Sequence, residues 1–335
     1  MTQIVDVLPL VTDDQRARIL EAPRTAEAHG ALLAEVPAMN MLEVGGTAGA
    51  SQLPASFGVA AWNVERCLFP QASADQLLAE NVAVVLLSEM DNGMARTAQN
   101  NTTAELAEAM GMRYTYGVEF YELDLGGPTE RPFCADDFNA AGWHGNGILS
   151  SVPFSRMSLL RLDKRGHWFL TGEDGGAGDP DQPRMGGRMA ILAELPTENG
   201  PICVVSTHLE SATGFELRHA QFDMILDAVE AFAPGMPVLI GGDLNTGNHL
   251  PPDYDHRKET LFAMAEERGY AWDLTAEGVT TRNSLITPHD TRRMKLDWFC
   301  HRGLSGTARP LLASLDPDGR PLSDHECILC DITVG

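Results

Sequence analysis

From residue 57 onward the chain is a succession of short apolar segments, each closed by a glycine, a proline or a polar side chain. Short apolar runs between such breakers are typical of buried strands. We predict strands at residues 57–65, 82–90, 113–123, 145–151, 188–195, 202–210, 238–242, 295–300 and 326–334. So many strands do not fit a sheet in which strands and helices strictly alternate. An α/β fold of two mixed sheets packed face to face, with helices outside, fits better.

Apolar residues at helical spacing occupy fewer stretches of this part of the chain. We predict helices at 73–81, 103–111, 215–232 and 256–269. Ser73 is the expected cap of the first, and Gly111 is expected to end the second.

Residues 1–55 precede this pattern and predict a helical extension. Residues 12–22 begin with a threonine and two aspartates, a typical helix start, and a second helical stretch follows at 25–36. The glycine-rich segment 43–56 is interpreted as a link. The predicted domains are therefore an N-terminal helical extension, 1–55, and a main domain, 56–335. A packed flap, a dimer contact and a mobile arm are all compatible with the extension, and the oligomeric state stays open.

Two stretches of the main domain, residues 122–142 and 163–187, predict surface insertions. The second contains a run rich in glycine, proline and acidic residues that is poorly suited to a packed core. The roles of both insertions stay open.

Acidic residues outnumber basic ones by 47 to 24, which gives a formal net charge of −23 at pH 7. A field of that sign repels polyanions, and non-specific binding to nucleic acid depends on neutralising phosphates. No cluster of lysine and arginine in the sequence predicts a local basic groove. The charge therefore argues against nucleic acid as a partner.

The apolar content of 44% and the charged content of 21% are typical of globular proteins. No apolar run approaches the roughly 18–20 residues of a membrane span, and the first residues lack the pattern of a signal peptide. We therefore expect a cytoplasmic protein without a membrane span.

The cysteines are widely scattered, and several lie in apolar runs. Buried free thiols are the expected state in the cytoplasm. Cys327 and Cys330 are spaced like a metal or redox pair, but residues three apart in a strand point to opposite faces. We expect no functional pair there.

Polar side chains terminate several of the predicted strands. They are Asn63, Glu89, His208, Asp243 and Asn245; in addition, Asp297 lies within a predicted strand, and Asp324 and His325 precede one. Each one alone is typical of a turn or a solvated strand end, but together they form a set of hard oxygen ligands with two histidines. Oxygen ligands without cysteine select Mg²⁺ or Mn²⁺ over Zn²⁺. Such an ion, a residue that orients water and an imidazole make a combination suited to metal-assisted hydrolysis of a phosphate ester.

The segments that carry these residues resemble the endonuclease/exonuclease/phosphatase superfamily, and in particular its deoxyribonuclease and neutral sphingomyelinase branches. They occur in the family's order over residues 57–334, as WNVE, LLSEMD, GNGILSS, GGRMAILAEL, STHLE, GGDLNT, LDWFC and SDHECI. The resemblance implies a four-layer α-β-β-α sandwich and a metal-dependent hydrolase of phosphate esters.

The resemblance also implies roles for a first group of side chains. Glu89 is similar to the principal metal-binding glutamate of the family, and Asn63 and Asp324 to its neighbours at the metal. Asn146 and Arg188 lie at positions where family members place side chains that contact the substrate phosphate.

A second group is implied to carry the chemistry. Asp243 is similar to the residue that orients the attacking water, and Asn245 to the amide that binds the phosphate. His325 is similar to the catalytic histidine, with Asp297 as its partner, and His208 to the second histidine of the deoxyribonuclease and sphingomyelinase branches.

The substrate is not implied by these segments, because residues 112–121 and both insertions match no branch-specific pattern. The leading hypothesis is a phosphodiesterase acting on a small-molecule or lipid-like phosphodiester. The alternatives are an endonuclease or exonuclease, and a non-catalytic binding protein that has kept the fold. The presence of the metal glutamate and of the terminal Asp-His pair argues against the last.

Overall fold

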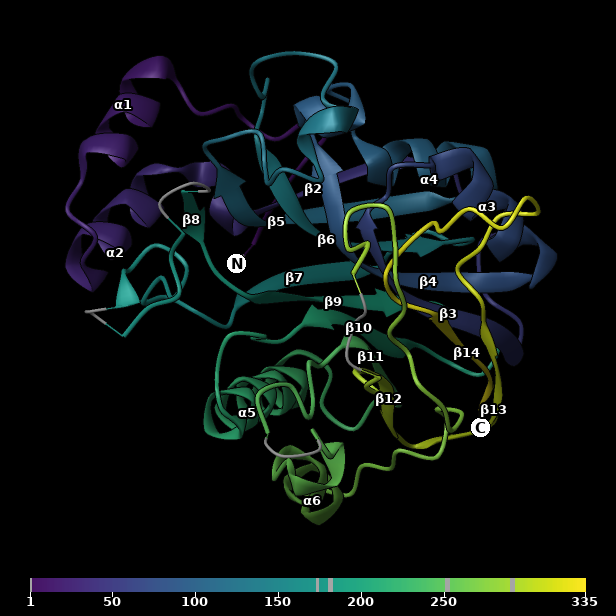
Figure 1. Ribbon diagram of the computed structural model, residues 1–335. Coiled ribbons are helices and arrows are strands. Elements are labelled where there is room, and N and C mark those ends of the chain that lie inside the picture. The colour runs from purple at the N-terminus through teal and green to yellow at the C-terminus, as the bar shows by residue number, and fades with distance from the viewer. Residues whose placement is uncertain (1, 173–174, 180–182, 251–253, 290–292) are drawn as a thin grey trace.

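The computed structural model describes residues 2–172, 175–179, 183–250, 254–289 and 293–335. Two mixed sheets pack face to face, and helices cover both outer faces (Figure 1). The predicted α/β sandwich of four layers is therefore confirmed.

The larger sheet has nine strands in the order β1-β2-β5-β6-β4-β3-β14-β13, with β8 paired to β5. Its strands are β1 (Gln3–Val5), β2 (Met41–Gly46), β3 (Ser56–Arg66), β4 (Val82–Asn92), β5 (Arg113–Glu122), β6 (Trp143–Ser150), β8 (Arg184–Gly186), β13 (Leu304–Leu312) and β14 (Cys327–Val334). The central pair β3–β4 is parallel, and β14 runs antiparallel to β3.

The smaller sheet has five strands in the order β12-β11-β10-β9-β7. They are β7 (Arg156–Arg161), β9 (Met189–Leu195), β10 (Ile202–His208), β11 (Val238–Asp243) and β12 (Asp297–Arg302). The parallel pair β10–β11 sets His208 opposite Asp243, and the antiparallel pair β11–β12 sets Asp243 opposite Asp297. The register of this sheet alone thus brings three of the predicted site residues to one level.

The helices form the outer layers. They are α1 (Asp13–Glu21), α2 (Ala26–Glu35), α3 (Pro70–Ala79), α4 (Thr102–Met110), α5 (Phe215–Phe232) and α6 (Leu261–Glu267). Figure 1 shows α3 and α4 above the larger sheet and α5 and α6 below the smaller one. None of the helices in the described part of the chain has the length and apolar character needed to cross a membrane.

The core between the sheets consists of side chains that alternate along the facing strands, among them Val84, Ile191, Val204 and Ile328. Burying an aliphatic side chain of this size contributes about 1.5–3 kcal/mol, so this layer is a main source of stability. The rigid double sheet holds the strand ends in place.

The cysteines behave as the sequence predicts. All are free thiols, and all but Cys134 are buried. Cys327 packs on the outer side of the larger sheet and Cys330 between the sheets. The two face opposite sides of β14, so they form no functional pair.

Two details of the predicted elements are wrong. Helix α3 starts at Pro70 and not at Ser73, because proline fits the first turn of a helix, where no backbone N–H is needed. The helix predicted at 256–269 is shorter, because a 3-10 helix at His256–Lys258 precedes α6, which begins at Leu261. Asn245 lies just beyond β11, and its φ of 51° turns the chain there. The strands β1, β2, β7, β8 and β13 are additional to those predicted.

The N-terminal extension contains the two expected helices and packs against the main body. Strand β2 joins the larger sheet next to β5, and the buried ring of His29 on α2 lies within hydrogen-bonding distance of the carbonyl oxygens of Lys164 (3.2 Å) and Gly186 (3.1 Å). A boundary between domains at residues 55 and 56 stays a prediction, and strands β1 and β2 add to the helical content expected there.

The two stretches predicted as surface insertions both contribute buried residues. Glu130 in the first is 4% exposed, and Phe169 in the second is 3% exposed. Residues 173–174 and 180–182 of the second lie outside the described part of the chain.

Candidate active site

The predicted strand-end residues gather at one edge of the sandwich, where both sheets contribute. The smaller sheet brings His208, Asp243 and Asp297 by its register. The larger sheet brings Asn63 from β3 and Glu89 from β4. The Nδ2 of Asn63 donates to Asp243 Oδ2 at 3.1 Å and so joins the two sheets.

Irregular backbone shapes β3 and β4 at this edge. The register of the pair shifts after Asn63, and Glu89 has a φ of 59° in the left-handed region. A bulge of this kind redirects a side chain and is frequent beside active sites. Here it turns the Glu89 carboxylate towards Asn63, whose Nδ2 donates to Glu89 Oε1 at 3.0 Å.

Asp243 is the centre of the cluster. Its Oδ1 accepts the backbone N–H of Asn245 at 2.8 Å. Its Oδ2 lies 3.5 Å from Nε2 of His208 and 3.6 Å from Nε2 of His325. With 2% of its surface exposed, Asp243 is held as an acceptor between both histidines.

His325 and Asp297 form a buried pair. The ring Nδ1 of His325 lies 2.8 Å from Asp297 Oδ2, which fixes the orientation of the ring and directs Nε2 towards Asp243. Burial acts to lower the pKa of His325, but the carboxylates of Asp297, Asp243 and Asp324 outweigh it and raise that pKa well above its usual value. These carboxylates therefore favour the protonated form of the imidazole.

A second cluster surrounds His208 and includes a residue that the sequence analysis missed. Glu119 on β5 is fully buried, and its Oε2 lies 3.6 Å from Nδ1 of His208. Arg188 NH1 donates to Glu119 Oε1 at 2.8 Å and lies 2.8 Å from His208 Nδ1. Burial acts to raise the pKa of Glu119, but Arg188 and His208 lower it to about 2. The sequence signal that could have revealed Glu119 is its position between Val118 and Phe120 in an otherwise apolar strand.

Arg66 is the other missed residue. Its NH1 pairs with Glu89 Oε2, and its Nε donates to Glu130 at 2.8 Å. Burial acts to raise the pKa of Glu89, but Arg66 holds it well below its usual range. Arg66 follows a predicted strand end, but its partner Glu130 lies in a predicted insertion, so the pairing was not legible from the sequence.

Two predicted residues have their contacts directed elsewhere. Asn245 Nδ2 donates to the carbonyl of Leu209 at 3.0 Å. Asn146 is fully buried between the sheets, and its Nδ2 donates to the carbonyl of Met189 at 3.3 Å. Its Oδ1 has no hydrogen-bond partner within the described ranges. The contacts of Asn146 do not include the other members of the site.

The donor set fits a hard divalent cation. Glu89, Asp243, Asp297 and Asp324 supply carboxylates, and the side chains of Glu89 and Asp324 remain 19% and 23% exposed. Burial and the carboxylates of Glu89 and Asp243 raise the pKa of Asp324 to about 6, against the opposing effects of His325 and Arg66. Crowded carboxylates of this kind are stabilised by a bound Mg²⁺ or Mn²⁺.

The ligand atoms of Asp243, Asp297 and His325 lie within 4.8 Å of one another, which also makes them a group that could hold a metal ion. The hydrogen bond between Asp297 and His325 already occupies the facing atoms of that pair. Glu89 and Asp324, whose side chains are partly exposed to solvent, are therefore better candidate ligands for a cation than the pair of Asp297 and His325.

The sequence of residues 60–325 matches the model of the Endonuclease/Exonuclease/phosphatase family. No curated protein sequence matches the chain.

Solved structures share the fold at low sequence identity. An endonuclease/exonuclease/phosphatase from Beutenbergia cavernae superposes with a TM-score of 0.60 and 19% identity, over 84% of this chain and 72% of its own. The human Nocturnin catalytic domain with a bound sulfate anion superposes with a TM-score of 0.56 and 17% identity, over 88% of this chain and 97% of its own. Humanised D. rerio TDP2 superposes with a TM-score of 0.52 and 16% identity, over 83% of this chain and 99% of its own.

Proposed function

This chain belongs to the endonuclease/exonuclease/phosphatase family, whose members hydrolyse phosphoester bonds, and on that premise we propose that it is a metal-dependent phosphodiesterase acting on a small or lipid-like phosphodiester. The observation that carries the proposal is the convergence on Asp243. Asn63, His208 and His325 meet its carboxylate from both sheets.

A Mg²⁺ or Mn²⁺ ion, held by Glu89, Asn63 and Asp324, would neutralise the non-bridging oxygens of the phosphate. Arg66 keeps the Glu89 carboxylate ionised, which such a ligand must be. The Nδ2 group of Asn63 donates to both Glu89 and Asp243 and so holds the two carboxylates next to each other.

Asp243 positions the attacking water and accepts its proton. Its carboxylate is held by the backbone N–H of Asn245 and by Asn63, so it cannot rotate away from the substrate. A base held in this way lowers the entropic cost of the in-line attack.

His325 stabilises the charge that develops on the phosphate. It is protonated because Asp297 and the neighbouring carboxylates favour the cation, and its Nε2 donates into the site. His208, held by Glu119 and Arg188, supplies a second imidazole beside Asp243, at the position where the sequence resembles the deoxyribonuclease and sphingomyelinase branches, which supports a diester as the substrate.

The substrate class rests on charge. The formal net charge of −23 opposes the approach of a long polyanion, whereas a small diester carries a single charge.

The test is hydrolysis of bis(4-nitrophenyl) phosphate and of 4-nitrophenyl phosphate with Mg²⁺ or Mn²⁺. We expect faster turnover of the diester, loss of turnover on addition of EDTA, and recovery when the metal is restored. Glu89→Gln and His325→Ala should each reduce kcat by about 100-fold or more while circular dichroism stays unchanged. Full activity in either variant, or in EDTA, would rule the assignment out.

A nuclease is the second candidate, and one surface favours it. A pocket of about 640 Å³ brings together His256, Arg257, Arg293 and Lys295 from separate stretches of the sequence, beside Asp255 and Glu277, which pair with Arg257 and Lys295. Such a patch is able to contact a phosphate backbone despite the overall negative charge. Cleavage of plasmid DNA or an RNA oligonucleotide at catalytic protein concentrations, abolished by EDTA, would favour this candidate.

A further inference from the structure

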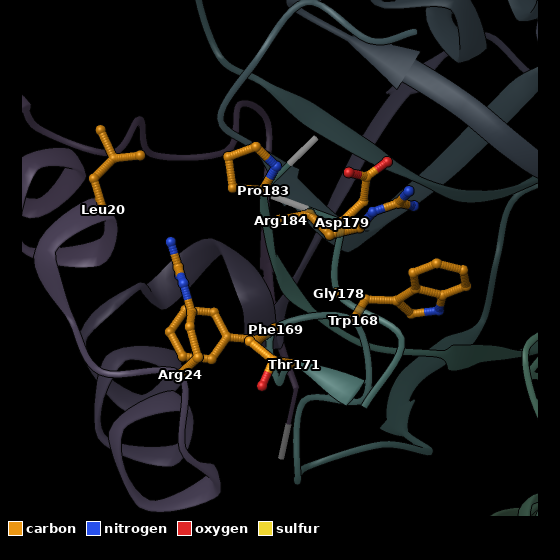
Figure 2. A pocket seen from close by; sticks show the side chains of 9 residues that line it. All are labelled: Leu20, Arg24, Trp168, Phe169, Thr171, Gly178, Asp179, Pro183 and Arg184. Carbon is orange, nitrogen blue, oxygen red and sulfur yellow. The ribbon is translucent and has the colours of Figure 1, made fainter. Parts of the chain in front are cut away.

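A cavity of about 280 Å³ lies between the N-terminal extension and the second insertion. Its lining residues are Leu20, Arg24, Trp168, Phe169, Thr171, Gly178, Asp179, Pro183 and Arg184. Figure 2 shows Leu20, Arg24 and Phe169 on one side of it and the Trp168 ring and Arg184 guanidinium on the other. The volume fits a part of a small molecule and not a polymer.

Two guanidinium groups line this cavity, and both lie over aromatic rings. Arg24 lies 4.5 Å from the centre of the Phe169 ring. Arg184 lies 4.6 Å from the Trp168 ring and 5.2 Å from the Phe120 ring. Stacking of this kind holds a guanidinium in place while its edge N–H groups stay available to an anion.

Neither arginine has a carboxylate as an ion-pair partner within the part of the chain that the structure describes. Acidic residues outnumber basic ones by 47 to 24 in this chain, so an arginine without a carboxylate partner is unexpected. Burial lowers the pKa of both Arg24 and Arg184, and a bound anion would offset this cost. Among the described lining residues the cavity thus has two guanidinium groups and one carboxylate, that of Asp179.

The wall of the cavity connects to the candidate active site. Trp168 Nε1 donates to the Glu210 carboxylate at 2.9 Å, and Glu210 lies 3.6 Å from Nε of Arg188. Arg188 in turn contacts His208. Arg184 and Arg188 also lie over the same ring, that of Phe120. The cavity therefore lies on the His208 side of the site, with the buried side chains of Glu210 and Arg188 between them.

We propose that this cavity is a substrate subsite that binds one anionic group, a phosphate or a carboxylate, attached to a flat or apolar part of the substrate. The inference rests on the proposed function. Arg24 and Arg184 bind the anion, and Leu20 and Pro183 contact the apolar part. Asp179 also lines the cavity, and its carboxylate disfavours a ligand that is anionic along its whole length. The subsite thus selects a small diester with a second charge over a nucleic-acid strand.

The kinetic test compares two substrates with the same leaving group, phenyl 4-nitrophenyl phosphate and 4-carboxyphenyl 4-nitrophenyl phosphate. We expect the carboxylated ester to be preferred about tenfold in kcat/KM, through a lower KM, because a charge-assisted contact contributes about this factor. The preference should disappear in Arg24→Gln and Arg184→Gln.

The matched control is Arg18→Gln. Arg18 lies on α1, is 57% exposed and pairs with Glu35 outside the cavity. The Arg18→Gln substitution removes one positive charge from the same region without touching the cavity, so the preference for the carboxylated ester should persist. Should Arg184→Gln fail to fold, Arg24→Gln decides, because Arg24 lies outside the helices and strands.

A binding test separates the subsite from the catalytic activity. Phenylphosphonate, which has no ester bond to hydrolyse, is titrated by calorimetry into the full chain in EDTA. Binding should be retained in Glu89→Gln and Arg18→Gln and lost in Arg24→Gln and Arg184→Gln. Equal binding and an equal substrate ratio in all variants would overturn the inference. Binding that depends on both arginines, without turnover of either ester, would leave the subsite standing and overturn the proposed function.

Discussion

Asp243 illustrates how one side chain acquires its role from its partners. A single aspartate after a strand is usually a turn residue. Here its two oxygens accept hydrogen bonds from Asn63 and from the backbone of Asn245, with a histidine on either side. The carboxylate therefore has one orientation, which is what the general base proposed at this position requires.

The pair of His325 and Asp297 gives a prediction at this scale. Asp297→Asn keeps the shape of the side chain but removes the negative charge that orients the His325 ring and favours its protonated form. We expect kcat for bis(4-nitrophenyl) phosphate to fall by about 100-fold with little change in KM. Steady-state kinetics at saturating metal measure this.

The chain contains a matched control on the same strand. His301 on β12 lies 2.7 Å from Asp273, and that carboxylate is 77% exposed. Asp273→Asn removes an Asp-His pair of similar length outside the site, so turnover should not change. Equal losses in both variants would mean that Asp297 acts only through stability.

At the scale of elements, the pairing of β10 with β11 is what aligns the site. Gly242 in β11 has a φ of 148°, and a Cβ there would lie 1.9 Å from the carbonyl oxygen of Thr207. The close approach sets Asp243 opposite His208. Only glycine permits both the backbone conformation and the contact.

Gly242→Ala should therefore destabilise the protein by about 2–3 kcal/mol, through strain and overpacking. Urea denaturation followed by circular dichroism measures the change. Gly49→Ala is the control, because a Cβ at Gly49 meets no atom within 4 Å. A Gly242 variant as stable as the Gly49 variant would show that β10 and β11 can separate without cost.

At the scale of the whole molecule, a buried ion network joins the first insertion to the sheet. Arg96, whose side chain is 1% exposed, pairs with Asp91 on β4, Glu122 on β5 and Glu130 in the insertion. Arg66 extends this network to Glu89 in the site. The network explains why a stretch with the composition of a loop is packed.

Arg96→Met should be strongly destabilising at pH 7, by about 3–5 kcal/mol, because it leaves buried carboxylates without a cation. Arg131→Met serves as control, since Arg131 is 48% exposed and its pair with Asp124 lies at the surface. Chemical denaturation of both variants at pH 7 measures the difference. Similar stabilities would contradict a structural role for the network.

The same network predicts the response to acid. Burial acts to raise the pKa of Asp91 and of Glu122, but Arg96 outweighs it and holds both below their usual values. Stability from these groups is present at neutral pH and is lost as the pH falls below about 4, where the unfolded carboxylates take up protons. In Arg96→Met this loss should be absent, so the difference in the free energy of unfolding between wild type and variant should narrow as the pH falls below about 4, which chemical denaturation at a series of pH values measures.

The sequence by itself determined much of the local structure and named most of the side chains that gather at the candidate site. Helix 215–232 and the strand before Asp243 were predicted from apolar spacing, because that pattern depends only on which face a side chain occupies. The oxygen ligands and histidines were recognised because they end strands, which is where a rigid scaffold presents side chains to solvent.

Only the tertiary structure decided the partners. Glu119 and Arg66 act on His208 and Glu89 across sequence distances that no local pattern records. Likewise, the two arginines of the cavity are 160 residues apart in the sequence and meet only because the N-terminal extension packs on the second insertion. Electrostatic contacts depend on distance in space, and that distance is set by the packing of the two sheets and not by the order of the residues.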